Sequence, residues 1–167
     1  MLRIGIGAAV IFISLMGMNG LVYAQDDERP TAAERAALLK CLRDKRQAQQ
    51  PEDGCIFSNV DVCMEKPGGH TTLGQRLCNT RENAIWDELL NECYKRLRAA
   101  VSKQGAKKLR NIQRSWISWR KAKCEMPYIL FEGGTLAGPL AAGCVLKATA
   151  LRAIELGTAL SSVGEKP

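Results

Sequence analysis

Apolar positions recur with the period of an α-helix between residues 72 and 103. The steps i, i+4, i+7, i+11 and i+14 place one set on a single helix face: Trp86, Leu90, Cys93, Leu97 and Ala100. Gln104 and Gly105 end the pattern, and Gly105 suits the left-handed position that follows many helices. The pattern predicts one long amphipathic helix from about Thr72 to Lys103.

A second helical pattern follows from about Lys107 to Cys124. Its apolar stripe comprises Leu109, Ile112, Trp116 and Trp119, and a more polar row lies beside it: Gln113, Ile117, Arg120 and Cys124. Two long amphipathic helices joined by a short Gly-containing turn favour an antiparallel hairpin. We expect this hairpin to be the centre of the fold.

The remaining pattern is also helical. Thr31 and Glu34 have capping-box spacing before a helix that runs to about Gln50, and Thr72 and Gln75 repeat that spacing. Residues 55–63 indicate a turn or a short helix, and the Pro-Gly-Gly sequence of residues 66–70 indicates a loop. Residues 125–143 hold too many Gly and Pro residues for a long helix, so the last helix is expected from about Cys144 to Leu160. The sequence predicts an all-α, disulfide-stapled bundle of about four helices.

The N-terminus has the features of a secretory signal. Arg3 precedes an apolar run, and Ala24 ends a site with small residues at the −3 and −1 positions. We expect cleavage after residue 24, a leader over 25–30, one domain over 31–160 and a flexible tail over 161–167. An uncleaved anchor is the alternative, although the run is shorter than the ~20 residues of a membrane span. No Cys follows the site, so a lipoprotein is not expected, and no later segment could span a membrane.

Seven cysteines in an exported chain indicate a disulfide framework. Cys124 and Cys144 bracket the breaker-rich segment, so we expect a bridge between them. Cys78 and Cys93 lie 15 residues apart on one predicted helix, about 22 Å, and cannot pair. Cys93 belongs to the apolar stripe and is expected to be a buried, inert free thiol. Two further bridges then join four cysteines, with three connectivities open: Cys41, Cys55, Cys63 and Cys78.

Four polar residues lie beside the apolar stripes in the middle of predicted helices: Asp87, Asn91, Arg120 and Arg152. We interpret them as an internal network in which Asp87 pairs with an arginine of a later helix. A binding or catalytic cluster is the alternative. Breaking a buried pair of this kind would leave an uncompensated charge.

The composition argues against an enzyme. The chain has one histidine, His70, no C-x-x-C sequence, no phosphate-binding glycine motif and no Ser/His/Asp set in a plausible context. We therefore expect no catalytic residue, metal or cofactor. The net charge of +7 favours anionic partners such as envelope polymers, or is simply a solvated basic surface. Nucleic acid is not an expected partner for an exported protein.

Several ordered motifs carry a family resemblance. They are Asp87-x-x-Leu90-Asn91-x-x-Tyr94, Gln113-x-x-Trp116-x-x-x-Arg120-x-x-x-Cys124, Gly133-Gly134-Thr135, Cys144 and Thr149-x-x-Arg152. Together, over residues 78–156, they resemble the secreted bacterial family of the lysozyme inhibitor LprI-like N-terminal domain. The resemblance implies a small helical envelope domain, named for a mycobacterial lipoprotein that inhibits lysozyme.

The function that the resemblance implies is a periplasmic or secreted protein that blocks a lysozyme cleft without catalysis. Lysozyme cleaves glycan with two carboxylates across a cleft, and a loop placed between them would exclude substrate. We expect the contact in residues 66–72 or 128–135, with these candidate binding residues: Lys66, His70, Tyr128, Glu132 and Thr135. The alternative is a non-enzymatic module that binds anionic envelope components.

Overall fold

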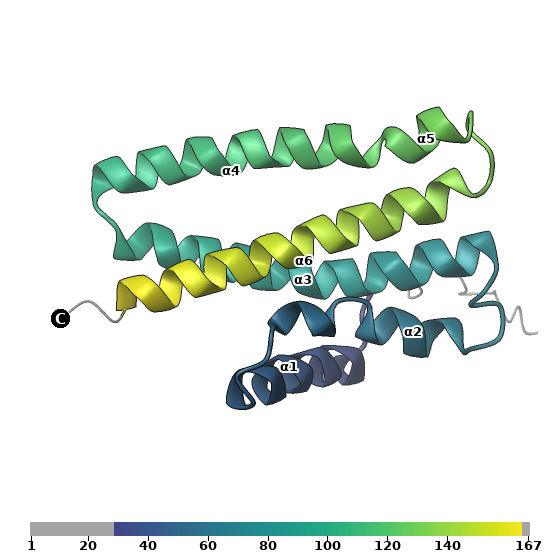
Figure 1. Ribbon diagram of the computed structural model, residues 1–167, viewed down its shortest axis with the longest axis horizontal. Helices are drawn as coiled ribbons and strands as arrows, with labels where there is room; N and C mark the ends of the chain where they lie inside the picture. Colours follow the sequence, from purple (N-terminus) through teal and green to yellow (C-terminus); the bar gives the residue numbers. More distant parts are fainter. Residues whose placement is uncertain (1–28, 165–167) are drawn as a thin grey trace, which may run out of the picture.

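The computed structural model describes residues 29–164, all of whose regular structure is helical (Figure 1). The elements in order are α1 (Ala32–Gln47), the 3-10 helix η1 (Glu52–Cys55), α2 (Ser58–Met64), α3 (Thr72–Ala100), α4 (Lys103–Cys124), α5 (Met126–Leu130) and α6 (Ala137–Gly164). The predicted all-α, disulfide-stapled bundle is confirmed. The predicted signal segment lies outside the described residues, and no helix within them is long and apolar enough to cross a membrane.

The most extensive packing joins α3 to α6, which run side by side in the same direction (Figure 1). Small residues at heptad spacing on α6 permit the close approach. A Cβ on Gly143 would lie 3.3 Å from Asn79 Oδ1, and one on Gly157 would lie 3.8 Å from the Cys93 sulfur. Ala150, midway between these glycines, is fully buried. The core is therefore built on this parallel pair, with Ile85, Trp86 and Leu146 fully or almost fully buried.

Helix α4 runs antiparallel to α3 and α6 and contacts mainly α6 (Figure 1). Its buried residues are Gln113 and Cys124, whereas Ile112 is 54% exposed and Trp119 is 51% exposed. The expectation that the apolar stripe of α4 faces the core is thus wrong at these two positions. The physical reason is that Gln113, Arg120 and Cys124 of the neighbouring row bond to residues of α6. The row therefore faces α6, and the apolar stripe lies to one side of this contact.

Helix α6 begins at Ala137, seven residues before its expected start. The segment 137–143 holds Gly138, Pro139 and Gly143, which favoured a loop. Pro139 lies in the first helical turn, where its missing N–H has no intrahelical partner to lose, so the helix tolerates it. Pro139 is also buried, so packing adds to the stability of this early start. The helix extends to Gly164, four residues beyond its expected end.

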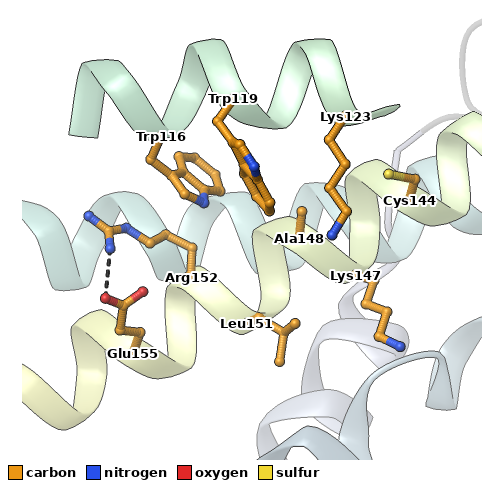
Figure 2. A pocket seen from close by; sticks show the side chains of 9 residues that line it. All are labelled: Trp116, Trp119, Lys123, Cys144, Lys147, Ala148, Leu151, Arg152 and Glu155. Carbon is orange, nitrogen blue, oxygen red and sulfur yellow. Dashed lines mark ion pairs between the residues drawn. The ribbon is translucent and has the colours of Figure 1, made fainter. Parts of the chain in front are cut away.

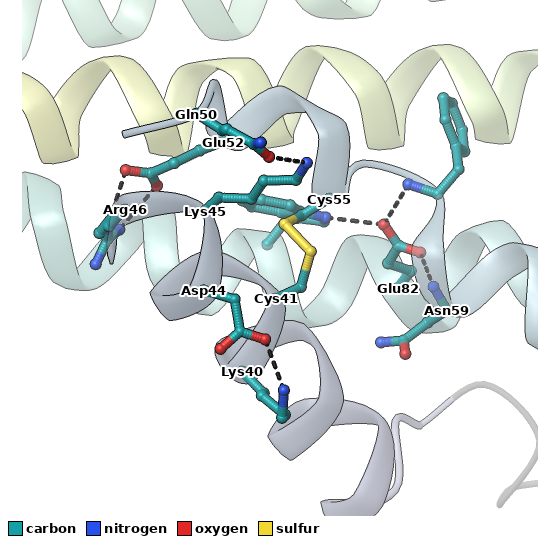
Figure 3. The surroundings of a disulfide bond; sticks show 12 residues. Lys40, Cys41, Asp44, Lys45, Arg46, Gln50, Glu52, Cys55, Asn59 and Glu82 are labelled. Carbon is teal, nitrogen blue, oxygen red and sulfur yellow. Dashed lines mark hydrogen bonds and ion pairs between the residues drawn. A yellow bond between two sulfur atoms is a disulfide. The ribbon is translucent and has the colours of Figure 1, made fainter. Parts of the chain in front are cut away.

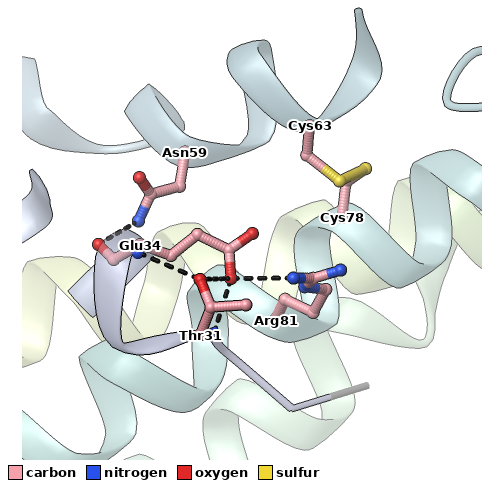
Figure 4. A network of polar contacts seen from close by, with 6 residues as sticks. All are labelled: Thr31, Glu34, Asn59, Cys63, Cys78 and Arg81. Carbon is pink, nitrogen blue, oxygen red and sulfur yellow. Dashed lines mark hydrogen bonds and ion pairs between the residues drawn. A yellow bond between two sulfur atoms is a disulfide. The ribbon is translucent and has the colours of Figure 1, made fainter. Parts of the chain in front are cut away.

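The start of α1 is fastened to α3. The predicted capping box of Thr31 and Glu34 is present, and Arg81 donates a hydrogen bond of 2.9 Å to the same Glu34 carboxylate (Figure 4). The second capping position is one residue earlier than expected: Thr71, not Thr72, accepts the hydrogen bond from the Gly74 N–H. Gly74 is required there because a Cβ would lie 2.1 Å from the Gly68 carbonyl oxygen.

A buried carboxylate holds α2 in place. Glu82 of α3 is 1% exposed, and each of its oxygens accepts two hydrogen bonds. Oε1 accepts from the Phe57 N–H and the Trp86 indole, while Oε2 accepts from the N–H groups of Asn59 and Val60 (part of this cluster is drawn in Figure 3). Glu82 therefore caps the N-terminus of α2 from a different helix.

Three disulfides staple the helices. Cys41 is bonded to Cys55 (Figure 3), Cys63 to Cys78 (Figure 4), and Cys124 to Cys144, which is the pair that the sequence analysis expected. The connectivity left open by the sequence is thus 41–55 and 63–78 in the structure. Cys93 is the free thiol and is half-buried rather than fully buried. Within residues 29–164, no three His, Cys, Asp or Glu side chains are grouped so that they could hold a metal ion.

Candidate functional site

Large apolar side chains are exposed in the segment that joins the end of α4 to the start of α6. Ile129 is 75% exposed and Leu130 is 68% exposed, and four neighbours in the sequence are also exposed: Met126, Tyr128, Phe131 and Leu136. We call residues 126–136 the α5 tip. Contiguous exposed apolar surface on a soluble protein commonly marks a place of contact with another molecule. The tip lies at one end of the bundle, beyond the C-terminal end of α4 (Figure 1).

The local sequence dictates the shape of the tip. Pro127 lies at the start of α5, where proline favours a helix, and the helix stops after one turn. Glu132 has a φ of 46° and Gly133 a φ of 76°, so the chain reverses through two left-handed residues. The Gly134 N–H donates to the Phe131 carbonyl at 2.7 Å, and the Ala137 N–H donates to Gly134 at 2.9 Å. The reversal leads directly into α6.

The base of the tip is covalently fixed. Cys124 ends α4 and is bonded to Cys144 in the second turn of α6, so the disulfide closes the loop that carries α5. Helix α5 also packs against α6. The exposed side chains are therefore presented on a closed and short segment. Such pre-organisation reduces the conformational entropy that binding would otherwise cost.

The structure brings the two predicted contact loops to the same end of the molecule (Figure 1). Tyr128 lies on α5, and Glu132 and Thr135 lie in the turn that follows, all exposed. Lys66 and His70 are exposed in the connection between α2 and α3. The first turns of α3 and α6 lie between the two loops and contact each other, with the Cδ of Arg76 3.8 Å from the position of a Cβ on Gly138.

The four residues of the predicted polar network form two separate groups. The Asn91 side-chain amide donates to the Asp87 carboxylate at 2.8 Å, four residues apart on α3. The expected ion pair between Asp87 and an arginine of a later helix is not formed among the described residues. The reason is that the arginines of both later helices have other partners: Arg120 donates to Thr149, and Arg152 pairs with Glu155 and donates to Gln113.

Arg120 and Arg152 form the second group, around Trp116. The Arg120 guanidinium donates to the Thr149 hydroxyl at 2.8 Å and lies 4.8 Å from the centre of a Trp116 ring. Arg152 donates to Gln113 at 3.1 Å and lies 5.8 Å from the same ring. These contacts join α4 to α6, and none of them involves the α5 tip.

The chemistry that the tip offers is apolar contact with a few polar groups. Its polar side chains belong to Tyr128, Glu132 and Thr135, and no cysteine, histidine or serine occurs in it. Glu125 and Glu132 give residues 125–137 two carboxylates and no basic residue, in a chain of net charge +7. The tip is thus a locally acidic, apolar protrusion on a basic protein.

Sequence reasoning located the tip as a loop but missed its character. Residues 126–131 are apolar without interruption, and this run next to a bracketing cysteine was the available signal. The run is too short to show a helical or a strand period. Glu82 was missed for a different reason, because a single carboxylate in a polar stretch of helix resembles a surface residue.

Comparisons with known proteins cover most of the described structure. A family model described as lysozyme inhibitor LprI matches residues 63–156, from the C-terminal part of α2 to α6, and includes the whole α5 tip. An uncharacterized protein of Rhizobium meliloti (strain 1021) is 27% identical over 146 residues, which cover 78% of this chain and 96% of that protein. No solved structure matches.

Proposed function

Because the chain belongs to the lysozyme inhibitor LprI family, we propose that it binds a lysozyme and covers its substrate cleft with the α5 tip, without chemistry of its own. The observation that carries this assignment of the contact is the exposed apolar run of the tip, fixed at its base by the Cys124–Cys144 bridge. The tip also lies within the part of the chain that matches the family model.

Shape supports the tip as the inhibitory element. A lysozyme cleft is concave and accommodates a glycan between two carboxylates. The complementary surface must be convex, and α5 with its turn is a protrusion at the end of the bundle (Figure 1). A few well-buried apolar residues at the centre of an interface supply most of its binding energy. Ile129 and Leu130 are the most exposed of the large apolar residues in the tip and are suited to that role.

Charge supports the same choice. Animal lysozymes are basic, so the mature chain, with 23 basic and 17 acidic residues and a net charge of +6, is repelled at long range. Residues 125–137 carry Glu125 and Glu132 and no cation, so the tip is the part of the surface best suited to approach a basic partner. A basic lysozyme that approached through α4 would instead meet repulsion, which added salt would screen.

The experiment measures how strongly the oxidised mature protein inhibits the lysis of cell walls by lysozymes of animal, phage and bacterial types. The test variant is Ile129→Ser with Leu130→Ser, and the matched control is Val62→Ser with Ile117→Ser, which removes exposed apolar side chains elsewhere. We expect the tip variant to raise the inhibition constant about tenfold or more. The control variant should inhibit like the wild type.

Two single substitutions separate the predicted loops. Tyr128→Ala should weaken inhibition and Lys66→Ala should not, if the tip alone makes the contact. Equal losses would extend the contact to the connection between α2 and α3. If micromolar oxidised protein inhibits no lysozyme, the proposal fails, and an unchanged tip variant would refute the role of α5.

The three disulfides and the family membership are typical of a protein outside the cytoplasm. We propose that residues 1–24 are a cleaved export signal and that the mature chain begins at Gln25. N-terminal sequencing of exported protein tests this, and an intact Met1 in the membrane fraction would contradict it.

A second candidate function is binding to anionic envelope material. Helix α4 favours it, because the helix carries eight basic residues and no acidic one: Lys103, Lys107, Lys108, Arg110, Arg114, Arg120, Lys121 and Lys123. None of them forms an ion pair with another residue of the described part of the chain. Cell-wall binding that weakens steeply with salt would support this candidate.

A further inference from the structure

A groove runs between α4 and α6 on the face turned away from α3 (Figure 2). Its volume is about 460 Å³, which lies within the usual range of small-molecule sites. Helix α4 contributes Trp116, Trp119 and Lys123 to one wall. Helix α6 contributes the other wall and the floor, chiefly Lys147, Ala148 and Leu151.

The groove exists because the apolar stripe of α4 does not enter the core. Trp116 is half-buried and Trp119 is 51% exposed, and Figure 2 shows both indoles directed toward α6. Leu151 on the facing helix is also exposed. Two indoles and a leucine thus remain partly uncovered in a concave surface, where a flat ligand could cover them without any change in the fold.

Positive charge borders this apolar surface. Lys123 Nζ lies 4.6 Å from the centre of a Trp119 ring, and Lys147 is exposed on the opposite wall. Arg152 at the floor is buried, and its charge is compensated by Glu155 at 2.8 Å while its Nε donates to Gln113. Lys123 and Lys147 form no ion pair with a described residue, so they remain available to an anionic ligand.

We propose that this groove binds a segment of a carboxylated glycan, with a sugar ring stacked on Trp119 and a sugar carboxylate held by Lys123 and Lys147. The C–H groups on one face of a sugar ring carry partial positive charge and stack on the electron-rich face of an indole. The sugar carboxylate would supply the negatively charged partner that the two ammonium groups lack. The proposal rests on the second candidate function, for which it names the site and the ligand class.

The geometry favours a glycan over a membrane surface. A helix that binds a bilayer interface needs a convex apolar face that can enter the headgroup region. Trp116 lies instead against α6, which forms the opposite wall of the groove and blocks such an approach. The disulfide framework is typical of an oxidising compartment outside the cytoplasm, where envelope glycans are accessible.

The test is a titration of the oxidised full domain, followed by intrinsic tryptophan fluorescence. The probes are trigalacturonic acid, the disaccharide of N-acetylglucosamine and N-acetylmuramic acid, and chitobiose, which lacks the lactyl carboxylate of that disaccharide. We expect the two carboxylated probes to bind with affinities that fall as salt rises. Chitobiose should bind at least about fivefold more weakly than the muramic acid disaccharide, since it cannot pair with the lysines.

The groove variants are Trp119→Ala and the double variant Lys123→Gln with Lys147→Gln. Each should weaken binding of the carboxylated probes about tenfold. The control double variant, Lys103→Gln with Lys107→Gln, removes the same charge from a different face of α4 and should bind within about twofold of the wild type. Lys123 and Lys147 are exposed, so the double variant should fold even if Trp119→Ala does not.

Three results with the glycan probes would overturn the proposal. They are no binding of either carboxylated probe, equal binding of chitobiose and the muramic acid disaccharide, and equal losses in the groove and control double variants. Binding to phosphatidylglycerol vesicles without binding to the glycans would also overturn it, in favour of a lipid surface. If cell walls bind with strong salt dependence while the groove variants behave like the wild type, the second candidate function stands and the groove is wrong.

Discussion

Replacing Glu82 by glutamine should destabilise the fold strongly although the two side chains have the same shape. Each carboxylate oxygen accepts two hydrogen bonds, from four different N–H groups. An amide keeps one accepting oxygen and directs an NH₂ group at two donors, whichever way it is oriented. Two buried N–H groups therefore lose their acceptor, at the N-terminus of α2 or at Phe57 and Trp86.

The magnitude follows from the contacts. A hydrogen bond to a charged group contributes about 1.5–3 kcal/mol, and a buried donor without a partner costs about 1–3 kcal/mol. Losing two of the four gives a destabilisation of about 3 kcal/mol for Glu82→Gln, and Glu82→Ala should cost more because it adds a cavity. With a urea slope of about 2 kcal/mol per molar, the glutamine variant should unfold at a midpoint about 1.5 M lower.

The assay is urea unfolding of the oxidised protein, followed by far-ultraviolet circular dichroism. Glu92→Gln is the matched control, because Glu92 lies on the same helix and is exposed. Its midpoint should remain within about 0.3 M of the wild type. If Glu82→Gln unfolds with the control, the buried carboxylate does not hold α2 as argued and the reasoning is refuted.

Three further predictions concern bridges and titrating groups. Replacing Cys124 and Cys144 by serine should lower the free energy of unfolding by about 3 kcal/mol, as expected for a loop closed over 20 residues, and peptide mapping of unreduced protein should recover the bridged pair. Burial raises the pKa of the Cys93 thiol. Iodoacetamide should therefore modify Cys93 slowly near neutral pH, and faster only at a pH above the pKa range of ordinary thiols. Rapid modification at neutral pH would argue against this environment. Burial acts to raise the pKa of Glu34, but the hydrogen bonds from the Thr31 N–H and from Arg81 outweigh burial and lower the pKa. The stability that Glu34 contributes should therefore be present above its ordinary pKa and be lost as pH falls through the lowered pKa. Glu34→Gln should flatten that acid dependence of the unfolding midpoint, and an unchanged slope would contradict the assignment.

The helices were predictable where the sequence carries a long period or a clear cap. Trp86, Leu90 and Leu97 follow the period of α3 and are buried as expected. The Thr31 cap also lies where the pattern placed it. These signals are local, since they depend on side-chain spacing within one helix and on the first turn of that helix.

The errors arose where tertiary contacts decide. Pro139 and two glycines favoured a loop, yet packing of α6 on α3 extends the helix through them. Gln113 was placed in a row beside the apolar stripe and Arg120 in a network with Asp87, but both have their partners on α6, and this orientation of α4 leaves Trp119 exposed. No spacing rule within α4 could reveal which side α6 would occupy.

The candidate site was predictable in position only. Tyr128, Glu132 and Thr135 lie in the exposed segment that the sequence indicated, whereas the apolar protrusion depends on how α5 is held between two helices. The groove between α4 and α6 could not be foreseen, because it arises from the rotation of α4. Asp87 was expected to pair with an arginine, but Arg120 and Arg152 bond to other residues and Asp87 accepts from Asn91 instead.

The three disulfides divide the molecule in a particular way. They span 14, 15 and 20 residues, and none crosses the connection at Val101 and Ser102. A single proteolytic cut at that connection would therefore release two fragments with no covalent link, each keeping its own bridges. Non-covalent packing, chiefly that of α6 on α3, would hold them together. The two fragments could thus be produced separately, as the halves of a split reporter protein are. The dissociation constant of the reassembled pair would measure the strength of an interface that is formed chiefly by α3 and α6.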